Sequence, residues 1–145
     1  MKEISFKNRK LGLTKYGFNE NFLIYGIEGG EYDFTDNLNF PNKQDGVYVF
    51  FTSQPQLDMD RMDIIFHCTM HYCGKTKDLR ERFDQHHHKD DLNGYSPLYI
   101  AVAFCDNEEE ITNLENRMLA CFRFTHNDPA LNTGAISANV EAVRI

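Results

Sequence analysis

Three apolar segments rich in β-branched and aromatic residues constrain the fold of this chain more than any other feature. They are "GVYVFF" at 46–51, "DIIFHCTMHYC" at 63–73 and "LYIAVAF" at 98–104. Each segment is typical of a β-strand. The third is apolar at nearly every position, which favours a central place in a sheet. The polar residues 52–62 predict a long hairpin loop between the first two strands.

Two further segments predict helices, one after the second strand and one after the third. Asp78 is followed three residues later by a glutamate, which is the spacing of a capping box and predicts a helix from about Leu79 to His88. The same spacing recurs at Asp106, where acids also suit the positive end of a helix dipole. This predicts a longer helix that ends near Phe124.

The order strand, strand, helix, strand, helix predicts an α+β domain with a small central three-stranded antiparallel sheet flanked by helices. A chain of 145 residues suffices for one such domain with a real core. We expect the domain to span residues 45–132. Residues 1–44 are polar and aromatic, and we expect them to form an N-terminal extension packed on the core. Residues 133–145 are expected to form a C-terminal tail.

The apolar runs and the cysteines indicate the compartment. No run approaches the ~18 residues of a membrane span, and no signal-peptide pattern opens the chain. The four cysteines lie in or beside apolar segments, where they are expected to be reduced and partly buried. The sequence therefore predicts a cytoplasmic protein with no membrane partner.

Charge is unevenly distributed along the chain. The net charge of -7 argues against a protein that coats nucleic acid by charge alone. Residues 75–89, however, hold five of the fifteen Lys and Arg residues against three acids, a local net charge of +2. Such a strip suits a site for one phosphate better than a long electrostatic track.

Two charged residues fall on helix faces that should be apolar. In the first predicted helix Arg82 shares an arc with Leu79, Phe83 and His86, and in the second Glu115 lies within the apolar stripe. A buried ionised group is costly unless it is paired. Two interpretations remain open. The two groups form a structural ion pair, or they line a cleft where the guanidinium binds a phosphate and the carboxylate holds a divalent cation.

An ordered set of short motifs surrounds these two charges. "GVY" at 46–48 is followed by "YCG" at 72–74, then by Arg82, Glu115 and "PALN" ending at Asn132. This set resembles the GIY-YIG nuclease domain over about residues 46–132. The chain departs from the family pattern in four ways: valine and cysteine replace the two isoleucines, the hairpin is longer, and the distance from Glu115 to "PALN" is stretched.

The resemblance implies a metal-dependent endonuclease that hydrolyses phosphodiester bonds, with DNA preferred over RNA. It assigns Glu115 to a single Mg²⁺ (or Mn²⁺) and Arg82 to a non-bridging phosphate oxygen. Tyr48 and Tyr72 would position or activate the attacking water. His86, one turn beyond Arg82, could relay the proton.

Three further residues are expected to bind the substrate. Lys75 follows Gly74, where a flexible backbone allows close approach to a phosphate, and Arg80 belongs to the same basic strip. Asn132 matches the closing asparagine of the family and is expected to brace the site rather than react. Plain structural roles remain open for these residues too: a surface lysine for Lys75 and a turn cap for Asn132. The two tyrosines could likewise be ordinary strand aromatics.

Two rival interpretations stand beside the nuclease. The first is a zinc site formed by His67, Cys68, His71, Cys73 and the histidines at 86–88. However, adjacent residues such as His67 and Cys68 point to opposite faces of a strand. The second rival is a catalytically silent module that keeps the fold and acts with a partner.

The predicted DNA contact is weak and sensitive to salt, because the chain is acidic overall. No separate DNA-binding motif is present in the sequence. Residues 1–44, the loop 52–62 and the tail 133–145 remain as candidates for specificity. Dimerisation or a protein partner would strengthen the contact.

Overall fold

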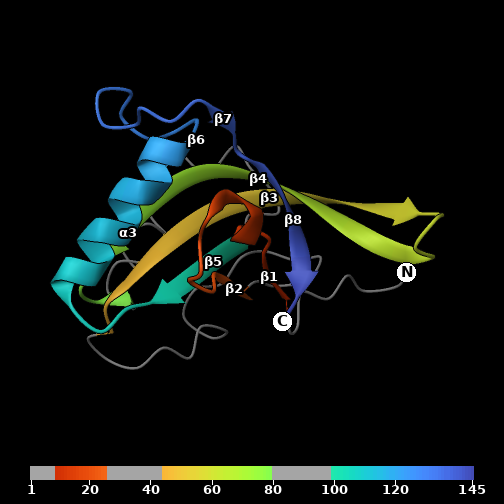
Figure 1. The fold of residues 1–145 in the computed structure, drawn as a ribbon, viewed down its shortest axis with the longest axis horizontal. Coiled ribbons are helices and arrows are strands. Elements are labelled where there is room, and N and C mark those ends of the chain that lie inside the picture. Colours follow the sequence, from red (N-terminus) through yellow and green to blue (C-terminus); the bar gives the residue numbers. More distant parts are fainter. Residues whose placement is uncertain (1–8, 26–43, 80–98) are drawn as a thin grey trace.

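Antiparallel strands dominate the computed structural model, which describes residues 9–25, 44–79 and 99–145 (Figure 1). Six strands form a closed barrel: β1 (Arg9–Leu11), β2 (Leu23–Tyr25), β3 (Gly46–Asp58), β4 (Asp63–Thr76), β5 (Tyr99–Phe104) and β8 (Asn139–Arg144). Their order around the barrel is β1-β2-β5-β3-β4-β8. The other described elements are a 3-10 helix (Thr14–Tyr16), helix α3 (Glu108–Cys121) and a parallel pair of short strands, β6 (Phe122–Arg123) and β7 (Ile136–Ser137).

The three strands predicted from the sequence are confirmed, and they are neighbours in the order β5-β3-β4. β3 pairs with β5 over Gly46–Phe51 and with β4 along its whole length. Residues 52–62 do not form the long loop that their polarity predicted. Instead both strands continue, and only the tight turn between Asp58 and Asp63 separates them. Polar side chains are compatible with these strand ends because they are largely exposed there.

The predicted fold class, an α+β domain built on a three-stranded sheet flanked by helices, is wrong. The sheet has six strands and closes into a barrel. Of the α-helices, α3 is the one whose two ends both lie in the described part of the chain. Closure comes from the two segments that the sequence set apart as extension and tail. β1 pairs with β8 through Arg9↔Arg144, and β2 pairs with β5. Closing the barrel leaves few unpaired sheet edges, which explains why these short strands are recruited.

α3 begins close to its predicted start, but the cap is one residue later than expected. Asn107, not Asp106, accepts the backbone N–H of Glu110, at 2.9 Å. The Glu110 carboxylate in turn accepts the backbone N–H of Asp106, at 2.8 Å. Asparagine is as good a cap as aspartate, so composition alone could not separate the two positions. The other predicted helix, from about Leu79 to His88, lies almost entirely outside the described residues.

The core lies inside the barrel and beneath α3. Along β3, Val47, Val49 and Phe51 belong to the main core cluster, whereas Tyr48 and Phe50 do not. This alternation follows from the pleat, which sends successive side chains to opposite faces. All five side chains are nonetheless buried. α3 adds its own buried residues to this core: Ile111, Leu114, Met118 and Leu119.

Candidate functional site

Gly74 allows the two predicted tyrosines to meet across the β3–β4 ladder. Tyr48 lies directly opposite Gly74, and the ring centroids of Tyr48 and Tyr72 are 6.1 Å apart. A Cβ atom on Gly74 would lie 2.5 Å from both Cζ and Oη of Tyr48, closer than real side chains approach. The Tyr48 phenol therefore occupies the space that a side chain at position 74 would fill. Tyr48 is only 1% exposed, whereas Tyr72 is partly exposed.

α3 packs beside β4 and brings the predicted metal ligand to this strand. Lys75 Nζ donates a 3.1 Å hydrogen bond to Thr112 Oγ1, one turn before Glu115. Glu115 is partly buried and lies close to Cys73. Burial, and then the negative charge of Glu115, raise the pKa of the Cys73 thiol well above its ordinary value. The helix thus aligns Thr112 with Lys75 and Glu115 with Cys73.

The tyrosines and the helix occupy different faces of β4. Cys73 and Lys75 alternate along the strand with Tyr72 and Gly74, so the two sets leave the backbone in opposite directions. α3 contacts the Cys73 face, and the tyrosine pair lies on the other. The structure therefore places Glu115 and Tyr72 on opposite faces of β4, both at the level of Cys73.

None of the described strands pairs with the edge of β4 beside Cys73, because β8 pairs with β4 only over Phe66–Thr69. The loop after β6 takes the place of a strand there. Asn127 accepts the backbone N–H of Cys73 at 2.9 Å and donates to its carbonyl oxygen at 2.8 Å. The backbone N–H of His126 donates to the carbonyl oxygen of His71, also at 2.8 Å. These bonds hold the strand that carries Tyr72.

Sequence reasoning missed Asn127, and no local signal would have found it. Its partner Cys73 lies 54 positions earlier in the chain. The chain around Asn127 is typical of a turn, where an asparagine ordinarily bonds to its own neighbours. Only the tertiary arrangement places its amide against β4.

Asn132, predicted to bind substrate, is 4% exposed and uses its amide on the backbone around the end of α3. Its Oδ1 accepts the N–H of Phe124 at 2.8 Å, and its Nδ2 donates to the carbonyl oxygens of Leu119 and Phe122 at 2.8 and 2.7 Å. These three bonds give the side chain a bracing role. Arg80, Arg82 and His86, also predicted as site residues, lie outside the described residues.

The cysteines behave as buried thiols. Cys68, Cys73 and Cys105 are buried and Cys121 partly so, and all four are free. Burial raises the pKa of Cys68 to about 12 and that of Cys105 to about 11. Zinc binds the thiolate form, which such burial disfavours.

The residues of the rival zinc site are divided between the two sides of β4. His67 is exposed while the adjacent Cys68 is buried, as strand alternation predicted. Within the described ranges, no three His, Cys, Asp or Glu side chains are grouped so that they could hold a metal ion. The histidines at 86–88 lie outside those ranges.

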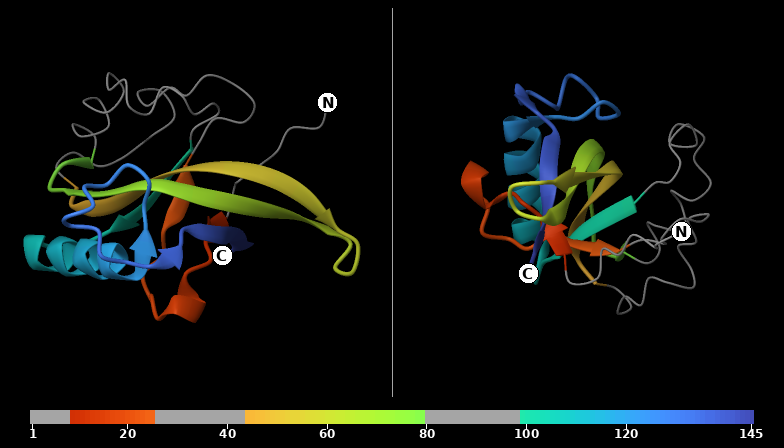
Figure 2. Two further views of the ribbon diagram at one scale, coloured as in Figure 1. Left: turned by 90° about the horizontal axis from the view of Figure 1, so that it is seen from above. Right: turned by 90° about the vertical axis from the view of Figure 1, so that its right-hand side faces the viewer.

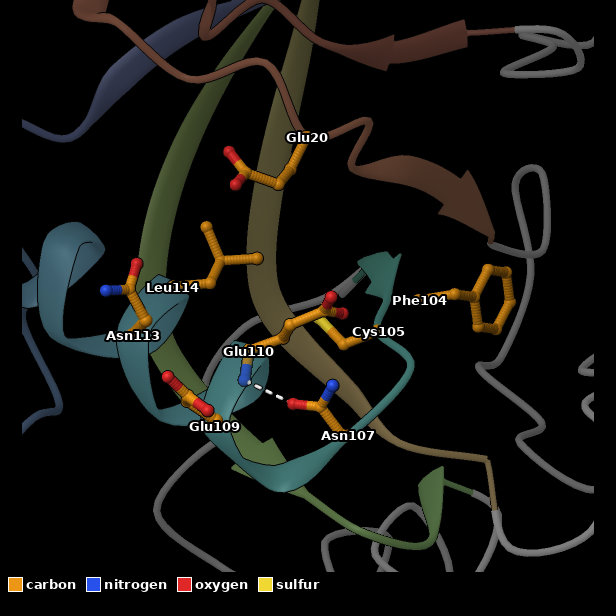
Figure 3. A pocket seen from close by; sticks show the side chains of 8 residues that line it. All are labelled: Glu20, Phe104, Cys105, Asn107, Glu109, Glu110, Asn113 and Leu114. Atoms are coloured by element: carbon orange, nitrogen blue, oxygen red, sulfur yellow. Dashed lines mark hydrogen bonds between the residues drawn. The ribbon is translucent and has the colours of Figure 1, made fainter.

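A cavity lined by described residues lies away from the predicted site. It has a volume of about 520 Å³ and lies between the first half of α3, the end of β5 and the segment before β2 (Figure 3). Its lining residues are Glu20, Phe104, Cys105, Asn107, Glu109, Glu110, Asn113 and Leu114. None of them is a predicted site residue.

Much of the polar lining of this cavity already serves the fold. Asn107 and Glu110 cap the helix, as the dashed bond in Figure 3 shows. Glu20 forms a two-pronged ion pair with Arg117, whose shortest contact is 2.6 Å. These side chains position α3 rather than define a ligand site.

Comparisons with models of protein families, with curated proteins and with solved structures find no match to this chain. No helix in the described ranges is long and apolar enough to cross a membrane.

Proposed function

We propose that the protein is a metal-dependent endonuclease of the GIY-YIG type, acting on DNA. The observation that carries this proposal is the meeting of Tyr48 and Tyr72 over Gly74, on the strand whose other face contacts the helix with Glu115. A tyrosine pair, a glycine that makes room for it and a nearby carboxylate supply water-positioning groups and a metal ligand for phosphodiester hydrolysis.

The proposed substrate position follows from the two faces of β4. Tyr72 and Glu115 lie on opposite faces of β4, and the Asn127 side chain occupies the edge beside Cys73, so in this proposal a phosphate reaches both only at the end of β4, beyond Gly74. Lys75 lies next to this end, and its hydrogen bond to Thr112 holds the ammonium group there. A phosphate bound at this end would gain the charge of Lys75 and, in this proposal, that of Arg82.

The residues near Glu115 suit magnesium better than a soft metal. Glu115 offers carboxylate oxygens, whereas Thr112 Oγ1, one turn earlier, already accepts the hydrogen bond from Lys75 Nζ. Mg²⁺ prefers oxygen ligands, keeps several waters and is often held by one carboxylate. When bound, the ion would stabilise charge on the phosphate and the leaving oxygen. Tyr72 would orient the water, and Lys75 would bind the phosphate.

A nicking assay tests this proposal. Supercoiled plasmid is incubated with the protein and Mg²⁺ or Mn²⁺ over a salt series, beside Glu115→Gln and the matched control Glu109→Gln. Glu109 lies on the same helix but is exposed. We expect the wild type and Glu109→Gln to nick the plasmid, and Glu115→Gln to lose about 10²-fold or more in rate, the usual cost of removing a group that stabilises the transition state.

A catalytically silent binding module is the second candidate, favoured by the burial of Tyr48. A phenol that is 1% exposed does not reach bulk water, which a general base requires. If wild-type protein binds an oligonucleotide in a filter assay but leaves plasmid intact with every metal and salt tested, the silent module replaces the nuclease. Binding that does not weaken with salt would contradict a phosphate contact in either case.

A further inference from the structure

The outer part of the β3–β4 hairpin extends beyond the barrel. We call residues 53–65 the arm. β5 ends its pairing with β3 at Phe51, and β8 ends its pairing with β4 at Phe66, so the arm strands pair only with each other. Figures 1 and 2 show this hairpin projecting past the other described strands. A two-stranded ribbon is marginally stable by itself in water, so an arm of this length gains from a partner.

One face of the arm is apolar and exposed. Leu57 lies directly opposite Ile64, and their exposed fractions are 59% and 41%. The turn adds Met59 and Met62, exposed by 67% and 77%. Strand alternation places Leu57 and Ile64 on the same face as the buried Phe66, so the core-facing side of the barrel continues outward with its apolar character. Large apolar side chains exposed close together in this way are typical of interaction sites.

The edge of the arm is less suited to a partner than its face. Pro55 removes a backbone donor from the free edge of β3, a device that discourages strand addition. The opposite face carries polar residues such as Gln54 and Gln56. A partner should therefore contact the apolar face.

Charges on the arm identify the kind of partner. Residues 58–63 contain three aspartates and one arginine, a net charge of -2, which disfavours DNA and anionic membranes. Arg61 pairs with Asp58 at 3.0 Å, and Arg144 pairs with Asp63 at 3.6 Å. Among the described residues, Asp60 at the tip has no ion-pair partner of this kind.

The base of the arm carries the matching charge. Arg9 lies over the Phe66 ring, 4.6 Å from its centroid, and forms no ion pair with a described residue. Its guanidinium donates a hydrogen bond to the carbonyl oxygen of Ala142, at 3.3 Å. One chain thus presents an acid at the tip of its arm, a base at the root, and apolar side chains between them.

We propose that the arm binds a second copy of this chain in a two-fold symmetric dimer. The apolar faces pack together with the tips pointing in opposite directions. Leu57 and Ile64 lie near the two-fold axis, and each Asp60 meets the partner's Arg9. A two-fold interface needs a self-complementary patch, and an acid and a base at opposite ends of one apolar face form such a patch. The dimer does not depend on the proposed nuclease activity.

Sedimentation velocity over a range of micromolar concentrations tests the dimer on the full chain. We expect the wild type to change from monomer to dimer as concentration rises. Leu57→Glu should weaken the dimer about tenfold or more, because it places a charge at the centre of the interface. The matched control is Gln56→Glu, which adds the same charge on the other face of the arm and should behave as the wild type.

A charge exchange makes the test specific for the proposed orientation. Asp60→Arg and Arg9→Glu should each weaken the dimer, and the double variant should recover it, with circular dichroism confirming that each variant folds. A wild type that stays monomeric at every concentration overturns the proposal. Dimerisation unaffected by Leu57→Glu, or a double variant no better than its parents, also overturns it. Arm-dependent binding to phosphatidylglycerol vesicles or duplex DNA, without dimerisation, would assign the arm to another partner.

Discussion

The side chain of Asn127 bonds to both backbone groups of Cys73, at 2.9 and 2.8 Å. On this side of β4, the Asn127 side chain takes the place of a neighbouring strand. It does so between Tyr72 and Gly74, where the predicted site requires a fixed backbone. The loop after β6 is joined to β4 again by the backbone bond from His126 to His71, at 2.8 Å. The Asn127 amide and this backbone bond together couple a loop late in the chain to the strand that carries Tyr72.

Replacing Asn127 should destabilise the fold more than its partly exposed position suggests. In Asn127→Ala the N–H and C=O of Cys73 both lose their partner, so we expect the free energy of unfolding to fall by about 1–3 kcal/mol. Urea denaturation measures this change. The control is Asn139→Ala, which also removes two asparagine hydrogen bonds, to Thr69 and Ser137, but at an exposed site. Equal losses in the two variants would contradict the role of Asn127.

Gly74→Ala should be destabilising because of Tyr48. The new methyl group would lie 2.5 Å from the Tyr48 ring, so the ring or the strand must shift, at a cost of about 1–3 kcal/mol. In a Tyr48→Ala background the nearest remaining contact of the methyl group is Tyr72 Cε1 at 2.9 Å, so the cost should fall but not vanish. A double-mutant cycle in urea measures the coupling. An equal cost in both backgrounds would mean that the cost comes from the contact with Tyr72 and not from Tyr48.

Asn132→Ala should lower stability through the end of α3. The substitution leaves the N–H of Phe124 and the carbonyl oxygen of Phe122 buried without this partner. Losing buried hydrogen bonds of this kind costs about 1–3 kcal/mol for each unsatisfied group. Asn132→Asp is the isosteric test, because it keeps the acceptor for Phe124 but loses both donors. Thermal unfolding should rank the wild type above both variants, and unchanged transitions would contradict the bracing role.

Stability should fall as the pH is lowered through the range of histidine titration, because of His71. This residue is 6% exposed, and its Nε2 lies 2.8 Å from Thr52 Oγ1. Burial, and then the charge of His126, lower its pKa below the ordinary value of about 6.5. The unfolded chain therefore binds the proton first. The stability contributed by neutral His71 is complete above pH ~6.5 and is lost as the pH falls towards the folded-state pKa.

Urea denaturation at pH values from about 5 to 8, the range in which histidine side chains titrate, measures this dependence. His71→Gln should flatten the profile, whereas His67→Gln, at an exposed position, should leave it unchanged. A wild-type profile that rises towards low pH would contradict the direction of the shift.

The strand segments could be predicted because their signal is local. β-branched and aromatic residues fill β3, β4 and β5, and the alternation of exposed His67 with buried Cys68 follows from the pleat alone. The acids before α3 also predicted its start to within about one residue.

By itself, then, the sequence determined three neighbouring strands, a helix with an acidic start and a pair of tyrosines on one hairpin. Only the tertiary structure decided that the sheet closes through Arg9↔Arg144, that the polar residues 52–62 extend the strands, and that Asn127 holds Cys73. The reason is physical. Three-residue strands such as β1 and β2 are too short to show a period, and a bond between distant residues depends on where the rest of the chain places them.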